Sequence, residues 1–296
     1  MERTKKPVEV IVKKLTTLCA LVVFFTLGAE ARKTDGITIW EKTKAANKSL
    51  KLTFKNTKHA GVNFKINHSQ EEINPNKKVM QFSGIELLDF LNKNNNFPNK
   101  KNINLVSIDS YTIQMPVADF IKSQALIATD GSSIKKPWSL GFPTLMFRNK
   151  DHKDFQSNPA WGAWWVSTVI LDDLNPILSI QNKEVDLNKA VGTITPSEDI
   201  SYPRGQRVLE TPKKLKKKIS KIAINKLLPE NQKSEFVKVH FMHTNKTFRI
   251  KTADLNQYFL AFKWNNKEIS STFGGPIQLC SQKLKECKYF VKRISW

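Results

Sequence analysis

Short runs in which apolar and polar residues alternate dominate the first half of the chain, a pattern typical of half-buried β-strands. Two segments follow helical spacing instead. Residues 83–91 predict a helix with Ser83 as N-cap and Glu86 three residues later, as in a capping box. Residues 116–122 predict a short helix that begins near a proline. Because strands and helices follow one another without regular alternation, we expect an α+β fold. The predicted strands are 50–54, 62–66, 79–82, 103–108, 111–115, 125–128, 144–147 and 164–171, with a turn at Asp130–Gly131.

The pattern weakens after residue 172, where proline and glycine recur between less regular segments. We predict that residues 173–212 connect two domains. The next segment, 213–228, has Leu215, Ile219 and Ile222 at helical spacing among many lysines. This spacing predicts a helix that covers a sheet and keeps its cations in solvent; an anion-binding face on the same helix is the alternative.

The two halves of the chain share an order of features. Residues 112–120 (TIQMPVADF) match residues 247–255 (TFRIKTADL), and a short apolar strand and a turn follow each. This self-similarity predicts two tandem, mixed, β-rich domains at residues 32–172 and 213–296, the second a diverged copy of the first. The later matching features are Gly141-Phe-Pro143 and Trp165-Val166 in the first half, and Gly274-Gly-Pro276 and Phe290-Val291 in the second.

The N-terminus has the three parts of a secretory signal peptide. Basic residues precede the apolar run Leu15–Leu27, and Ala29-Glu-Ala31 supplies the small residues of a cleavage site. The apolar run is shorter than the roughly 20 residues that span a bilayer. We therefore predict a signal peptide at residues 1–31 and a periplasmic or secreted mature protein without a transmembrane segment. The signal region carries five Lys or Arg and three Asp or Glu, so a net charge of +22 becomes +20.

The composition of the 296-residue chain, 40% hydrophobic and 25% charged, fits a globular protein and argues against a disordered or fibrous one. The sequence contains no P-loop, GxGxxG, HExxH or GxSxG motif, so it does not indicate the enzyme classes that those motifs mark. After signal cleavage only Cys280 and Cys287 remain. In an oxidising compartment we predict that they form a hairpin disulfide, with two unpaired thiols as the alternative.

Five motifs together point to a known family. FSGIELLDFL (82–91), DSY (109–111) and LIATDG (126–131) follow one another in the first half, and GGPIQL (274–279) and FVKRI (290–294) close the second. These motifs resemble those of the molybdopterin-binding domain of the sulfite oxidase family. The resemblance implies a molybdopterin-oxidoreductase-like fold, molybdopterin as the cofactor and oxidoreductase activity.

Two positions that this family uses for its chemistry differ here. Active members hold molybdenum through a cysteine thiolate in the first half of the domain, whereas this chain has no cysteine between Cys19 and Cys280. The motif's arginine, which the family places near the anionic pterin and substrate, is Gln278 in one copy and Leu145 in the other. Because a soft thiolate is the ligand around which such a metal site is built, we expect a non-catalytic binding protein without catalytic residues or cofactor. A periplasmic oxidoreductase that binds molybdopterin without the cysteine is the alternative.

The candidate ligand-binding residues lie mainly after the Gly-Phe-Pro strand, where the resembling family builds part of its cofactor pocket. Arg148, Lys150, His152 and Lys153 are candidates for an anion site there, with solvated loop charges as the alternative. Trp164, predicted to face outward, and Gln278 complete the set. The positive charge predicts an anionic ligand, an acidic protein or a membrane surface as partner; a nucleic acid fits an exported protein less well.

His240 and His243 are the remaining pair with a metal-binding alternative. A strand would place them on opposite faces, and no third ligand is evident in the sequence. We therefore predict two surface histidines and no metal site.

Overall fold

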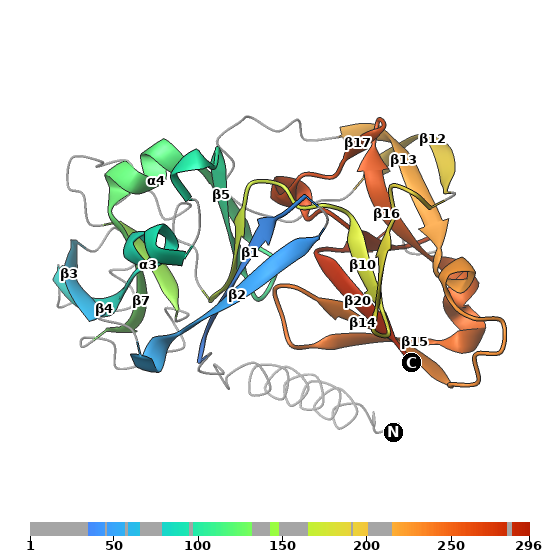
Figure 1. Cartoon of the computed structure of the whole chain (residues 1–296), viewed down its shortest axis with the longest axis horizontal. Helices are drawn as coiled ribbons and strands as arrows, with labels where there is room; N and C mark the ends of the chain where they lie inside the picture. Colours follow the sequence, from blue (N-terminus) through green and yellow to red (C-terminus); the bar gives the residue numbers. More distant parts are fainter. Residues whose placement is uncertain are drawn as a thin grey trace, which may run out of the picture.

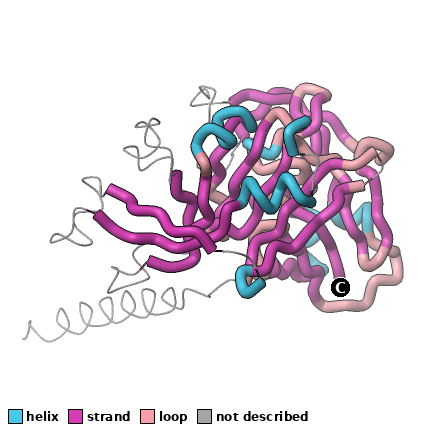
Figure 2. Tube along the Cα trace, turned by 60° about the vertical axis from the view of Figure 1, so that its left-hand side comes forward, coloured by secondary structure: helices cyan, strands magenta, loops and turns pink. Residues whose placement is uncertain are grey.

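The computed structural model describes residues 35–44, 46–56, 59–65, 79–94, 97–131, 143–147, 165–190, 192–200, 215–282 and 286–296. The predicted signal peptide lies outside these residues. Within them, no helix has the length and apolar character needed to cross a membrane. Figure 1 shows the first half of the chain, blue to green, beside the second half, yellow to red, along the longest axis. Strands dominate over short helical segments (Figure 2), so the protein belongs to the β-rich α+β class.

The first half, which we call unit 1 (residues 36–171), contains two sheets. The first has the strand order β2-β1-β9-β5-β6, in which β1 and β9 are parallel and the other neighbours antiparallel. The second is antiparallel with the order β3-β4-β7-β8. The elements are β1 (Gly36–Lys42), β2 (Asn47–Thr53), η1 (Phe54–Asn56), β3 (His59–Lys65), β4 (Val79–Glu86), α3 (Leu87–Asn94), η2 (Phe97–Asn99), β5 (Asn102–Ser107), β6 (Thr112–Pro116), α4 (Val117–Ser123), β7 (Ala125–Gly131), β8 (Thr144–Phe147) and β9 (Val166–Leu171).

The second half, unit 2 (residues 177–295), also contains two sheets. The first has the order β11-β10-β20-β14-β15, and the second has the order β12-β13-β16-β18-β19, with β17 paired to β16. The elements are β10 (Ile177–Ile180), β11 (Lys183–Asp186), β12 (Thr193–Ile200), β13 (Leu215–Ala223), η4 (Ile224–Leu227), β14 (Phe236–Phe241), β15 (Thr247–Lys251), η5 (Thr252–Gln257), β16 (Tyr258–Trp264), β17 (Lys267–Glu268), η6 (Ser271–Phe273), β18 (Gln278–Ser281), β19 (Cys287–Lys288) and β20 (Val291–Ser295).

The two units share one topology. In each, the first strand forms a hairpin with the second and pairs in parallel with the last, since β10 pairs with β20 as β1 does with β9. The irregularities in strand pairing also occur at equivalent places. One lies between β5 and β9 in unit 1 and between β14 and β20 in unit 2. The other lies between β4 and β7 in unit 1 and between β13 and β16 in unit 2. The topology therefore agrees with the repeat seen in the sequence. The sequence match of residues 112–120 to residues 247–255 aligns β6 with β15 and α4 with η5.

The predicted connection at residues 173–212 is wrong. It contains β10, β11 and β12, which pair within the two sheets of unit 2, so the second unit begins near Ile177 rather than at residue 213. These strands are short or lie at sheet edges, and β10 and β11 have only four residues each. Short edge strands need little hydrophobic alternation, and their sequence signal is weak for that reason.

The predicted helix at residues 213–228 is also wrong, because β13 occupies its first part. Ile219 and Ile222 are three residues apart, as on one helical face, but they pair with Trp264 and Leu260 on β16. Ile219 packs in one apolar cluster and Ile222 in another, on opposite faces of the sheet. A strand buried on both faces therefore imitates helical spacing. Only η4 is helical.

Two local expectations in unit 1 change as well. The helix predicted from residue 83 begins at Leu87, because residues up to Glu86 continue β4. Gly84 permits this: a Cβ there would lie 2.0 Å from the carbonyl oxygen of Ile127 on β7. Asp130 and Gly131 pair with β4 as the end of β7 rather than forming a turn. The predicted hairpin of β5 and β6, the helix α4 and the strands β7 and β8 are confirmed.

Each unit has its own hydrophobic core. In unit 1, α3 and α4 bury Leu87, Leu91 and Phe120 in a cluster with residues of both sheets. In unit 2, the side chains of Ile224 on η4 and Leu255 on η5 are buried against the two equivalent sheets. Each fully buried side chain of this size contributes about 1.5–3 kcal/mol, so each unit holds its own sheets together.

The first sheet of unit 1 packs against the turn that follows β14 in unit 2. The Ser167 hydroxyl donates to the carbonyl of His243 at 2.6 Å, and the Thr168 hydroxyl donates to that of Met242 at 3.0 Å. The two units also share an apolar cluster, comprising Val106, Ile170, Leu174, Met242 and Phe290. Both hydrogen bonds and buried apolar contacts therefore hold the junction together.

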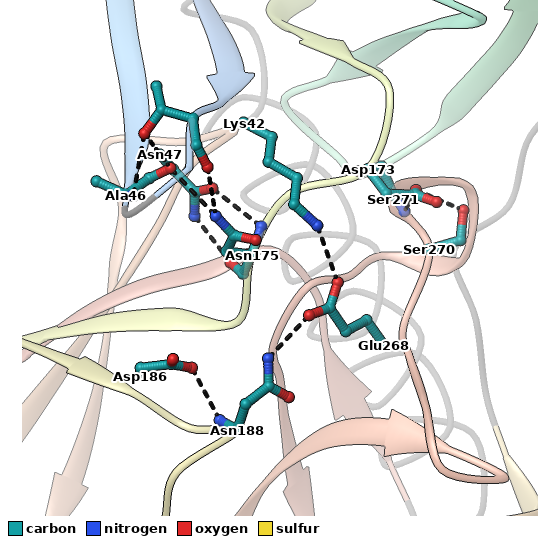
Figure 3. A network of polar contacts seen from close by, with 11 residues as sticks. Lys42, Ala46, Asn47, Asp173, Asn175, Asp186, Asn188, Glu268, Ser270 and Ser271 are labelled. Atoms are coloured by element: carbon teal, nitrogen blue, oxygen red, sulfur yellow. Dashed lines mark hydrogen bonds and ion pairs between the residues drawn. The ribbon is translucent and has the colours of Figure 1, made fainter.

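A second set of contacts joins the units beside the segment that connects them (Figure 3). The Asp173 carboxylate accepts from the hydroxyl of Ser270 and from the backbone N–H of Ser271, both at 2.8 Å. Lys42 forms an ion pair with Glu268 at 3.3 Å. These contacts fix where unit 2 sits against unit 1.

Candidate functional site

A cavity of about 330 Å³ lies where equivalent turns of the two units meet. Unit 1 contributes residues 108–110 between β5 and β6. Unit 2 contributes residues 241–248 between β14 and β15, and residues 287–289 at β19. This volume lies within the range of small-molecule sites. The lining residues are Ile108, Asp109, Ser110, Phe241, His243, Thr244, Lys246, Thr247, Phe248, Cys287, Lys288 and Tyr289.

The two turns are built in the same way. In unit 1 the N–H of Ile108 donates to the carbonyl of Trp165, and in unit 2 the N–H of Met242 donates to the carbonyl of Phe290. Both aromatic residues have a positive φ, 52° for Trp165 and 60° for Phe290, which is uncommon for residues of this size. The recurring aromatic-Val pair of the sequence therefore occupies equivalent positions in the two units.

His243 is the buried polar group of the cavity. Its side chain is 8% exposed and its ring lies 5.4 Å from that of Phe290 and 5.9 Å from that of Phe241. Burial, with a smaller contribution from the charge of Lys292, lowers the pKa of His243 to about 4, so the ring is neutral near pH 7. Its Nδ1 atom has no hydrogen-bond partner within the described residues.

Lys288 brings a positive charge to the cavity lining. Its ammonium lies 4.8 Å from the centre of the Phe248 ring, in a cation–π contact between two lining residues. The neighbouring residue Cys287 forms a disulfide with Cys280, so a covalent link fixes β19 against β18. The pairing that the sequence predicts is therefore present in the structure, and it positions Lys288.

The other charged residues of the cavity are Lys246 and Asp109. The Asp109 carboxylate accepts from the backbone N–H of Tyr111 at 3.1 Å and thereby closes the β5–β6 turn. With His243 neutral, two lysines face one carboxylate. Together with the aromatic walls, this lining suits a small ligand that has both an anionic group and an apolar body.

Most residues that the sequence proposes for ligand binding lie outside the described residues: Arg148, Lys150, His152, Lys153 and Trp164. Gln278 is described and is fully buried. Its Nε2 atom donates to the carbonyl of Phe273 at 2.7 Å, and it does not line the junction cavity. Strand pairing also gives Gln278 a different counterpart in unit 1. Gln278 lies opposite Ala261 in unit 2, and Thr144 lies opposite Ala128 in unit 1. The equivalent residue is therefore Thr144 and not Leu145.

The prediction of two surface histidines is wrong for His243, because Met242 and His243 turn into the junction after β14 ends. Spacing along a strand could not reveal this, since the burial comes from the other unit. His240 is half-buried, and its Nε2 atom lies 2.9 Å from the hydroxyl oxygen of Ser295. No group of three or more His, Cys, Asp or Glu within the described residues is arranged to hold a metal.

The residues present do not fit a cysteine-ligated molybdenum cofactor. Cys280 and Cys287 are bonded to each other, so neither offers a thiolate. The chain's other cysteine, Cys19, lies within the predicted signal peptide. No free cysteine thiolate is therefore present among the described residues to bind molybdenum.

A larger cavity, of about 520 Å³, lies within unit 2 between the β10–β11 hairpin, η4 and the C-terminus. Its lining is mainly apolar, with Ile180, Val185, Leu227 and Trp296, and Lys183 supplies its charge. The junction cavity is the stronger candidate because charged groups from both units converge there.

Comparison with known proteins finds no protein-family model and no curated protein that matches this chain.

Proposed function

We propose that the chain is an exported, non-catalytic binding protein made of two sulfite-oxidase-like units, and that its junction cavity binds a small anionic ligand. The supporting observation is the convergence of Lys246, Lys288 and the neutral ring of His243 on one cavity with aromatic walls. The ligand class that matches this lining is an aromatic or apolar carboxylate. Its carboxylate would pair with the ammonium groups, and its ring would pack against Phe248.

The alternative, an oxidoreductase that binds molybdopterin without the cysteine, has no supporting observation at this cavity. N-terminal sequencing and molybdenum analysis of protein from an exporting, cofactor-competent host test both parts of the proposal. A chain that begins at Arg32 and lacks molybdenum agrees with it. Stoichiometric molybdenum with pterin fluorescence would contradict it.

Substitution of Lys288 by Gln tests the ligand site. The change removes the ammonium over Phe248 and keeps most of the side-chain volume, so the affinity for benzoate should fall about tenfold, or about 1.4 kcal/mol. Isothermal titration calorimetry with benzoate, and separately with inorganic phosphate, measures the effect.

Lys226→Gln is the matched control, because Lys226 is an exposed lysine of η4 that does not line the cavity. Its affinity for benzoate should stay within about twofold of the unchanged protein, well inside a tenfold effect. Equal losses in the two variants, or no saturable binding of either probe, would refute the cavity as an anion site.

A further inference from the structure

One face of the first sheet of unit 2 is exposed and basic. Along β14 and β15, Val237, Val239 and Ile250 point into the core, while the residues between them project from the opposite face. We call this outward surface the basic face. It comprises Lys238 and His240 on β14, Arg249 and Lys251 on β15, and Arg293 on β20.

The side chains on this face lie directly across from one another on neighbouring strands. Lys238 lies directly opposite Arg249, and His240 lies directly opposite Arg293. Burial lowers the pKa of His240, and the charges of Arg293, Lys292 and Lys238 lower it further. Like charges directly opposite on neighbouring strands destabilise a sheet by several tenths of a kcal/mol, about 0.2–1.

No carboxylate among the described residues forms an ion pair with Lys238, Arg249 or Arg293. In the pairing register the acidic residues on this side are Glu184 and Asp186, both on β11, and β10 lies between β11 and Arg293 on β20. The cations of this face therefore lack a direct carboxylate partner among the described residues.

The equivalent face of unit 1 is covered by protein. The common topology places Lys238 at the position of Asn104, His240 at that of Val106, and Arg293 at that of Thr168; all three unit 1 residues are fully buried. Thr168 donates to the carbonyl of Met242, and the Thr272 hydroxyl donates to Asn104 Oδ1 at 3.3 Å. Unit 1 thus uses this face to bind a neighbouring folded unit.

We propose that the basic face of unit 2 docks a partner protein that presents a carboxylate-rich surface. The equivalent face of unit 1 shows that the sheet's shape accepts a protein surface, and the exchange of Asn104 and Thr168 for cations selects an acidic one. A second copy of this chain is a poorer match for this face, because each copy has a strongly positive net charge, +22 for the whole chain and +20 without residues 1–31. This proposal rests on the sheet face alone and does not depend on the junction cavity.

The test compares the unchanged protein with the triple variant K238Q/R249Q/R293Q and a charge-matched control, K48Q/K51Q/K226Q. The control lysines are exposed and lie on β2 and η4. Fluorescence anisotropy with labelled poly-L-glutamate at physiological salt measures binding. Unlabelled heparin and phosphatidylglycerol vesicles serve as competitors from the other anionic classes.

Poly-L-glutamate should bind the unchanged protein, and the face variant should lose about tenfold or more in affinity, while the control changes within about twofold. The face variant should also unfold at the same or a higher temperature, because a like-charge pair is removed. Three results would each overturn the proposal: no binding of poly-L-glutamate, equal losses in both variants, or a face-dependent preference for heparin or the vesicles.

Discussion

At the scale of single residues, burial rather than sequence context decides the chemistry. His240 and His243 look alike in the sequence, yet the junction buries His243 and lowers its pKa to about 4, while His240 stays half-exposed. The same holds for Gln278, whose amide is used inside unit 2. The contacts that a residue makes with another unit cannot be predicted from the sequence of its own strand.

Acidification should therefore destabilise the protein through His243. Its pKa is near 6.5 in the unfolded chain and about 4 in the folded one, so between these values the unfolded state binds more protons. The stability that the neutral ring contributes is complete above about pH 6.5 and is lost as the pH falls toward 4, by up to about 3 kcal/mol.

Urea denaturation at pH 7 and pH 4.5 measures this effect in the unchanged protein and in His243→Gln. The variant should lose distinctly less stability on acidification, because its amide does not titrate. Parallel losses in the two proteins would show that His243 is not buried in the neutral form.

At the scale of elements, the sequence correctly predicts the strands and helices in which the spacing of apolar residues matches the side that is buried. β5, β6, α4, β7 and β8 lie where the alternation or the helical spacing places them. β13 fails because both of its faces are covered, and β10 and β11 fail because they are short. The match between residues 112–120 and 247–255 was the most informative signal, since it aligns β6 with β15.

The hairpin of β18 and β19 should depend on its disulfide. Removing the link between Cys280 and Cys287, as in the double variant C280A/C287A, frees a short loop in the unfolded chain and should cost about 2 kcal/mol of stability. Because Lys288 follows Cys287 directly, benzoate affinity should fall as well. Thermal unfolding and calorimetry measure the two effects; unchanged benzoate affinity would show that the disulfide does not position Lys288.

At the scale of the whole molecule, the cavity and the basic face both follow from placing two similar units side by side. The cavity arises where the β5–β6 turn meets the β14–β15 turn, and its residues are far apart in the sequence. In the sequence, His243 stood out as a surface histidine, Cys287 as a disulfide partner, and residues 109–110 and 247–248 as parts of a motif and a repeat; none of them pointed to a shared cavity. The junction itself could not be predicted, because the second unit begins within the segment taken for a connection.

The most direct measurement is an NMR titration of protein labelled with ¹³C at the histidine rings. The chain has five histidines, and only His243 lines the junction cavity among the described residues. Addition of benzoate should shift the His243 resonance in a saturable way, leave His240 in place, and lose its effect in Lys288→Gln. Benzoate binding that leaves His243 unchanged, or that moves His240 instead, would contradict a ligand site at the junction of the two units.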